Sequence, residues 1–245
     1  MLPLMLSRIT RTLRLLVPLP AWWIVSRQMD GGARRLLDVG CGQGGPIHYI
    51  RSRRRLFAVG ADIFSPYLRQ HLDRGTYDGL VRCDVRLLPF AAGAFDVVFC
   101  GEMLEHLEEA DGLAFLASLE RLAGRQVILT TPVGRCDQHP YDGNEYQAHR
   151  SAWTPAALRG LGYRVRGSGV RGMGGLIARE NSPLPDWLRL LANAMWLAAT
   201  PLSYFLPEIG GSMVCLKEVD LTPAVTPVSQ VEDGVAAGVG VPDER

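Results

Sequence analysis

Short apolar runs alternate with helix-compatible segments along most of this chain, and this alternation is the strongest constraint on its fold. Apolar runs of this kind, separated by helices, are typical of a parallel sheet that is covered by helices. The sequence therefore predicts an α/β domain. The expected strands span 35–40, 57–63, 80–85, 95–101, 126–132, 163–169 and 212–219, and the expected helices span 44–54, 65–74, 103–110 continuing into 112–123, and 154–162.

The first apolar run leads into a glycine-rich turn, LLDVGCGQGG, at residues 36–45. Glycines lack Cβ atoms and so let a ligand touch the backbone, and the helix that follows offers free N–H groups. This pattern indicates a nucleotide-type site. A glycine fingerprint alone does not say which nucleotide it binds.

Acidic residues stand at the ends of the first three expected strands, and they narrow the choice of ligand. Asp38 precedes the glycine turn, where it would repel a pyrophosphate but suits a ligand with an ammonium group. Asp62 is placed to accept hydrogen bonds from both hydroxyls of a ribose, and Asp84 to accept one from an adenine amine. The glycine turn and Asp62 also occur in nicotinamide dehydrogenases, but Asp38 and Asp84 argue against that alternative.

The order LLDVGCGQGG, GADI, CDVRLLPF, FDVVFCGEMLEHL and ILTTP resembles class I S-adenosylmethionine-dependent methyltransferases. The most similar pattern is the small-molecule type with a Leu-Glu-His signature after strand four. The resemblance covers about residues 35–219. It implies a Rossmann-like, doubly wound sheet of seven strands, mostly parallel with an antiparallel last strand, and S-adenosyl-L-methionine as cofactor.

The resemblance also implies where the cofactor binds. Its methionine part would lie against the end of strand one and the end of strand four, and its adenosine part against the ends of strands two and three. The implied residues are Asp38, Gly40, Gly42, Gly101 and Glu102 for the methionine part, Asp62 for the ribose, and Ile63, Asp84 and Val85 for the adenine.

Methyl transfer from a sulfonium needs a general base only when the acceptor atom carries a proton. His149 is a candidate for that base or a histidine that holds its loop, and His106 is a candidate base or a packing residue. We carry both as catalytic candidates. The wider pool of polar residues near them is Glu105, His139, Tyr141 and Tyr146.

The acceptor is expected to be a small or lipid-like molecule rather than a nucleic acid. The chain has a net charge of +1 and lacks both the Asn-Pro-Pro-Tyr and the Pro-Cys motifs of nucleic-acid methyltransferases. Its five cysteines are scattered, which is typical of reduced, cytoplasmic proteins. No metal site is expected, because the fragment Cys136-x-x-His139 has no second pair of ligands.

Three segments lie outside the predicted methyltransferase domain of residues 31–220 or are inserted in it. Residues 1–30 contain an amphipathic basic helix expected to act as a lid, and 221–245 are expected to be disordered. Residues 183–209 form an apolar insertion, expected to be a helical hairpin because Pro201 interrupts it. Either 1–25 and 184–206 pack on the domain, or they bring the protein to a membrane surface.

Two functions follow from these observations. The leading hypothesis is an S-adenosylmethionine-dependent methyltransferase that acts on a small or lipophilic acceptor by in-line displacement, in the cytoplasm or peripheral to the membrane. The alternative is a non-catalytic, membrane-associated module that retains the methyltransferase fold. The acids at 38, 62 and 84 favour a working cofactor site.

Overall fold

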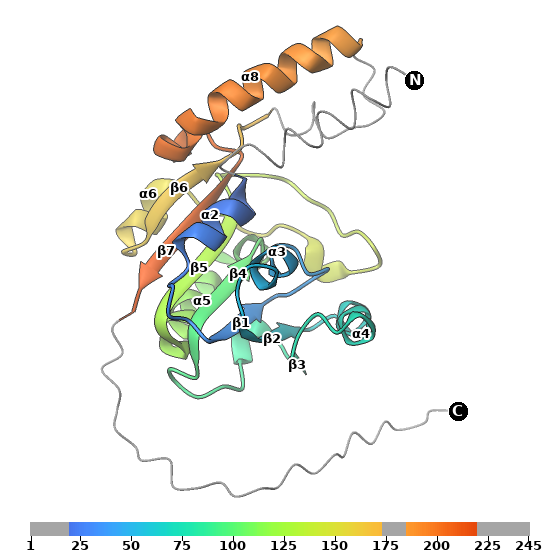
Figure 1. Ribbon diagram of the computed structural model, residues 1–245, viewed down its shortest axis with the longest axis vertical. Helices are drawn as coiled ribbons and strands as arrows, with labels where there is room; N and C mark the ends of the chain where they lie inside the picture. Colours follow the sequence, from blue (N-terminus) through green and yellow to red (C-terminus); the bar gives the residue numbers. More distant parts are fainter. Residues whose placement is uncertain (1–19, 173–184, 220–245) are drawn as a thin grey trace, which may run out of the picture.

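A computed structural model describes residues 20–172 and 185–219, which form one seven-stranded sheet flanked by helices (Figure 1). The strand order is β3-β2-β1-β4-β5-β7-β6, and β7 runs antiparallel to both of its neighbours. This confirms the predicted doubly wound sheet with an antiparallel last strand. The strands are β1 (Arg35–Val39), β2 (Phe57–Asp62), β3 (Gly79–Arg82), β4 (Phe95–Gly101), β5 (Ala123–Pro132), β6 (Arg164–Ser168) and β7 (Ser212–Glu218).

Helices connect these strands and lie on both faces of the sheet. They are α2 (Ala21–Gln28), α3 (Ile47–Arg51), α4 (Ser65–Arg74), α5 (Glu109–Leu122), α6 (Pro155–Gly160) and α8 (Asp186–Phe205). Short 3₁₀ turns are η1 (Val85–Leu87), η2 (Leu104–His106), η3 (Glu145–Gln147) and η4 (Pro207–Ile209). Most of the expected lid helix and the expected disordered tail lie outside the described residues.

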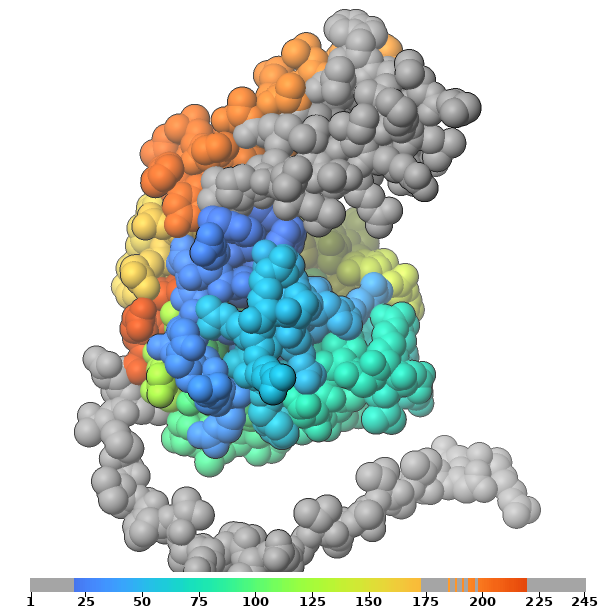
Figure 2. Space-filling model, in the orientation of Figure 1, coloured from blue at the N-terminus to red at the C-terminus, as the bar shows by residue number. Residues whose placement is uncertain are grey.

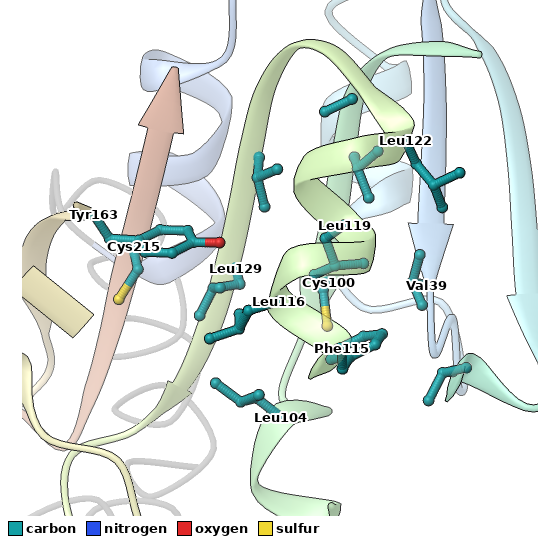
Figure 3. Packing of buried hydrophobic residues seen from close by; sticks show 14 of the residues in the cluster. Val39, Cys100, Leu104, Phe115, Leu116, Leu119, Leu122, Leu129, Tyr163 and Cys215 are labelled. Atoms are coloured by element: carbon teal, nitrogen blue, oxygen red, sulfur yellow. The ribbon is translucent and has the colours of Figure 1, made fainter. Parts of the chain in front are cut away.

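The core has two layers because successive side chains of a strand point to opposite faces of the sheet. Leu37 and Val39 of β1 belong to the layer covered by α5, whereas Leu36 belongs to the layer covered by α2 and α3. Figure 3 shows Leu116 and Leu119 of α5 packed toward the first of these layers. Most side chains in both layers are almost fully buried, so the layers hold the strand ends in place.

Two expected elements end differently from the prediction. The segment 103–110 forms only the turn η2, and α5 begins at Glu109, because the backbone carbonyl of Glu105 accepts the N–H groups of Arg150 and Ser151 instead of a helical one. The third strand ends at Arg82. Asp84 follows it as the N-cap of η1 and accepts the backbone N–H of Arg86.

The predicted helical hairpin at 183–209 is wrong for the residues that are described, because α8 is a single helix of 20 residues with Pro201 inside it. Proline removes one helical N–H donor. Near it, the Thr200 hydroxyl donates to the carbonyl of Trp196, and the Ser203 hydroxyl donates to the carbonyl of Thr200. Neither of these carbonyls is the one that loses its helical donor, which belongs to residue 197, and the helix nevertheless continues through Pro201.

The C-terminal half of α8 packs against β6, at the edge of the sheet (Figure 1). Contact is close at Gly167, where a Cβ atom would lie 2.1 Å from the carbonyl oxygen of Ser203. Glycine is therefore required there. Within the described ranges 20–172 and 185–219, we find no helix with both the length and the apolar character needed to span a bilayer.

Candidate functional site

The candidate site lies at the carboxyl ends of the parallel strands, where two cavities meet. The smaller has a volume of about 210 Å³ and the larger of about 950 Å³. Open α/β sheets bind ligands at this edge. Five residues line both cavities and mark the junction between them: Gly40, Gly42, Glu102, His106 and Gln147.

The glycine turn brings backbone to this junction. Gly40 and Gly42 have φ angles of +68° and +48°, in the left-handed region that side chains disfavour. A Cβ atom on Gly40 would lie 2.9 Å from Cγ of Met103, whereas one on Gly42 would meet no atom closer than 3.8 Å. The space beside Gly42 is therefore open for a ligand, and a side chain there would fill it.

Asp62 lies at the end of β2 and lines the smaller cavity. Its Oδ2 accepts the N–H of Gly42 and its Oδ1 accepts the N–H of Phe64, both at 2.8 Å. Because each carboxylate oxygen has two lone pairs, each can accept one further bond. The carboxylate is thus oriented and can still accept from a pair of hydroxyls.

Asp84 and Val85 line the same cavity, together with Ile63. The guanidinium of Arg86 donates to the Asp84 carboxylate at 2.6 Å, and this bond lowers the pKa of Asp84. The carboxylate therefore stays ionised as a hydrogen-bond acceptor at the cavity wall.

Asp38 lines the larger cavity but is only 3% exposed. Its Oδ2 accepts a hydrogen bond from the Tyr77 hydroxyl at 2.6 Å. Burial raises the pKa of Asp38 to about 7, although the bond from Tyr77 opposes this and the nearby Asp62 adds to it. A buried carboxyl in this state favours a cation as its partner.

Glu102 follows β4 with a φ angle of +49°, which is unusual for a residue other than glycine. Its N–H donates to the carbonyl of Thr130 at 2.9 Å, and its Oε1 accepts the Ser212 hydroxyl at 3.1 Å. These bonds hold the strained backbone in place. Burial raises the pKa of the Glu102 carboxyl.

Next to Glu102, the structure brings Glu105, His106 and His149 together. Their potential ligand atoms all lie within 4.8 Å of one another. Burial and the neighbouring Glu102 raise the pKa of Glu105 to about 8. Burial lowers the pKa of His106, so that its imidazole is neutral near pH 7. The group can therefore hold or release a proton at the cavity wall.

All nine residues expected to hold the cofactor line one or both of the cavities. Of the catalytic candidates, His106 lies at the junction and His149 in the larger cavity. Tyr146 lines the smaller cavity and Tyr141 the larger one. His139 is exposed and lines neither of them.

The donor set fits S-adenosylmethionine. A pair of free acceptor positions on Asp62 matches a ribose, the ionised Asp84 matches an adenine amine, and the buried Asp38 matches an ammonium group. The open space beside Gly42 leaves room for the part of the cofactor between them.

Several residues of the site could not be found from the sequence. Tyr77, which donates to Asp38, belongs to no recognisable motif, and Thr131 lies in the ILTTP motif but nothing there signals that it donates to Glu105. Trp22, at the start of α2, lines the larger cavity next to Tyr49 of α3. These contacts join segments that are distant in sequence, and no local pattern signals them.

The residues that match a known family model include all nine that are expected to hold the cofactor. Residues 37–129 match the model of a methyltransferase domain. Together with the seven-stranded sheet and the donor set above, this match supports a class I S-adenosylmethionine-dependent methyltransferase.

Individual relatives agree with that class. The chain is 26% identical over 184 residues to a ubiquinone biosynthesis O-methyltransferase of Acinetobacter baumannii, a match that covers 62% of this chain and 77% of the relative. It is 32% identical over 120 residues to the enzyme of the same name from Bordetella parapertussis, covering 46% and 49%. The fold also matches a solved structure, the [4+2]-cyclase SpnF, with a TM-score of 0.50 and 19% identity over 81% of this chain and 80% of that one.

Proposed function

We propose that the protein transfers a methyl group from S-adenosylmethionine to a hydroxyl oxygen of a small, lipophilic molecule. The observation that carries this proposal is the larger cavity, which opens from the cofactor site at Glu102 and His106. Its lining is rich in aromatic rings: Trp22, Tyr49, Tyr67, Phe99 and Tyr141. Cavities of this size and lining suit a small molecule with an apolar body.

The names of the relatives support oxygen as the methylated atom, since both are called O-methyltransferases. The chemistry of the site is consistent with that choice. A bound S-adenosylmethionine supplies an electrophilic methyl group on a sulfonium. A hydroxyl acceptor must lose its proton, and Glu105, His106 and His149 lie where such a proton can be taken up.

The protein's own contribution is alignment and exclusion of water. Asp38, Asp62 and Asp84 line the cavities where they would hold the cofactor at three points and so keep it in one orientation. The walls of the larger cavity would hold the acceptor on the opposite side. In-line displacement requires this arrangement, with the acceptor oxygen opposite the departing sulfur.

The test is an activity screen with S-adenosylmethionine that carries a deuterated methyl group. Phenols and catechols with alkyl side chains would be compared with amine analogues of the same shape, and products would be detected by mass spectrometry. We expect methylated products from the hydroxyl compounds only. Transfer to the amines alone would contradict the proposal, and cofactor binding without any transfer would favour the non-catalytic alternative.

We further propose that α8 contacts a lipid surface from which an apolar acceptor is drawn. One face of this helix and its C-cap carry apolar side chains that are at least half exposed: Leu191, Met195, Leu202, Phe205 and Leu206. The helix lies at one end of the described molecule (Figure 2). An exposed apolar stripe of this extent is typical of an interaction surface.

Co-sedimentation with liposomes tests this second proposal. We expect the protein to bind vesicles that contain anionic lipid, and the double change Leu202→Glu and Phe205→Glu to reduce the bound fraction severalfold. Leu72→Glu, at an exposed leucine of α4, is the matched control and should leave binding unchanged. Equal binding by all three proteins would contradict a role for α8.

A further inference from the structure

Three side chains at the wall of the larger cavity form a group with the composition of a metal site. Glu105 and His106 belong to η2, and His149 comes from the loop after β5. Glu105 and His106 are 3% and 8% exposed, and the side chain of His149 is 9% exposed. Two imidazoles and one carboxylate are a common ligand set for divalent transition metals.

Both histidines are held so that the same nitrogen is available. Nδ1 of His106 lies 3.1 Å from the carbonyl oxygen of Ala148, and Nδ1 of His149 bonds to the carbonyl oxygen of Cys136. A carbonyl can only accept, so each Nδ1 carries the proton and each Nε2 keeps its lone pair. Metal-binding histidines are oriented in this way by their second nitrogen.

The carboxylate of Glu105 has one hydrogen-bonded oxygen and one oxygen without a hydrogen-bond partner among the described residues. Oε2 accepts the hydroxyl of Thr131 at 2.9 Å. Oε1 is fully buried and has no hydrogen-bond partner among the residues that the structure describes. It lies 4.0 Å from Nε2 of His149, so the unpartnered oxygen points into the group. A buried acceptor without a partner is costly unless something binds it.

The backbone fixes the spacing between the two segments. The carbonyl of Glu105 accepts the N–H groups of Arg150 and Ser151 at 2.8 and 3.1 Å, directly after His149. The N–H of His149 in turn donates to the carbonyl of Gln138. The histidine loop is thereby tied to η2, and the three side chains are preorganised rather than brought together by chance.

We propose that Glu105, His106 and His149 bind one divalent transition-metal ion, of the zinc or manganese class, through Oε1 and the two Nε2 atoms. Metal–ligand bonds of about 2.0–2.2 Å place ligand atoms roughly 3.3 Å apart, so atoms that now lie within 4.8 Å must approach one another by up to about 1.5 Å. Rotations of the side chains supply this. Three protein ligands leave positions on the ion open toward the cavity.

This site deepens the proposed O-methylation, on which its catalytic role rests. An acceptor hydroxyl bound to the open position would become more acidic, and its proton would pass to solvent. The resulting oxygen anion would form the new bond to the methyl carbon as the carbon–sulfur bond breaks. The bonding electrons would go to sulfur, which would become a neutral thioether. The three residues would then act as ligands, and no free base is required.

Metal binding is measured directly on the full chain, without cofactor or acceptor. Protein treated with chelator and then dialysed is titrated with Co²⁺, whose visible absorption reports low-coordinate sites, and with Zn²⁺ by calorimetry. We expect one ion per chain and at least tenfold weaker binding in Glu105→Gln, His106→Ala and His149→Ala. His139→Ala, an exposed histidine of the same loop, is the control and should bind like the wild type.

S-adenosylmethionine calorimetry and thermal unfolding on the same samples show that each variant is folded. Failure of the intact protein to bind one ion, while it binds the cofactor, would overturn the metal site and leave the proposed function standing. Binding that survives in all three cluster variants would also overturn it. Ion binding that depends on the cluster in a protein that does not bind the cofactor would support the site and contradict the proposed function.

Discussion

The carboxylate of Asp62, at the end of β2, accepts the backbone N–H of Gly42 at 2.8 Å. This bond ties the glycine turn after β1 to the neighbouring strand. It fixes the turn and at the same time orients the carboxylate toward the smaller cavity. The residue thus holds the turn and offers its remaining lone pairs to a ribose.

Removing this carboxylate should weaken cofactor binding. We expect Asp62→Ala to reduce the affinity for S-adenosylmethionine at least about tenfold, because two buried hydrogen bonds are lost. Isothermal titration calorimetry measures this. Asp73→Ala removes an exposed acid from α4 and is the matched control for charge. An unchanged affinity in Asp62→Ala would refute the ribose role.

The raised pKa of Asp38 predicts that cofactor affinity depends on pH. Because its pKa is about 7, the carboxyl is largely protonated at pH 5.5, and an ammonium group can bind well only after the proton leaves. Affinity for S-adenosylmethionine should therefore rise with pH between 5.5 and 7.5, by up to about tenfold per unit.

Asp38→Asn should flatten that pH dependence and weaken binding at pH 7.5. The asparagine oxygen can still accept from Tyr77, so the local structure is kept. The pH dependence of the free energy of unfolding gives an independent check on the direction of the pKa shift of Asp38. A carboxyl whose pKa is raised on folding destabilises the protein as pH rises from about 4 to about 7, and the variant should lack this loss. The same slope in wild type and variant would contradict the assignment.

The packing of α5 predicts a large cost for shortening one of its leucines. Leu119 is fully buried against the sheet, next to Cys100 in Figure 3, whereas Leu113 on the same helix is 45% exposed. We expect Leu119→Ala to lower the free energy of unfolding by about 2–5 kcal/mol and Leu113→Ala by less than about 1 kcal/mol. Urea denaturation of both variants measures the difference. Equal costs would mean that α5 is oriented differently.

Gly167 sets how closely α8 approaches β6. A Cβ atom there would collide with the backbone of Ser203 and also lie 2.8 Å from Cα of Pro207. We expect Gly167→Ala to displace the end of α8 and to speed proteolytic cleavage in that segment severalfold. Gly160→Ala, where a Cβ atom would meet nothing within 4 Å, is the control. Unchanged cleavage in Gly167→Ala would show that α8 does not pack at this position.

The sheet was predictable because its signals are local. Most strands contain a short apolar run, and an acid lies at the end that faces the ligand in β1 and β2, at Asp38 and Asp62. Parallel connections then place those ends at one edge. Seven strands, the antiparallel β7 and the meeting of the nine expected residues all follow from this pattern and from the family resemblance.

What could not be predicted depends on contacts between distant segments. The pairing of His149 with Glu105 relies on backbone bonds from Arg150 and Ser151, which end the expected helix after His106. The single helix α8 contradicts the expectation that Pro201 breaks it, since the helix continues on both sides of the proline. Neither effect leaves a periodic trace in the sequence.

The most direct test of this account is calorimetric titration of the full chain with S-adenosylmethionine and, separately, with NAD. The three acids at 38, 62 and 84 line a site that suits an adenosine bearing an amino acid. The same acids would repel an adenosine bearing a pyrophosphate. We predict binding of one S-adenosylmethionine per chain and no measurable binding of NAD. Binding of NAD without binding of S-adenosylmethionine would contradict the central claim.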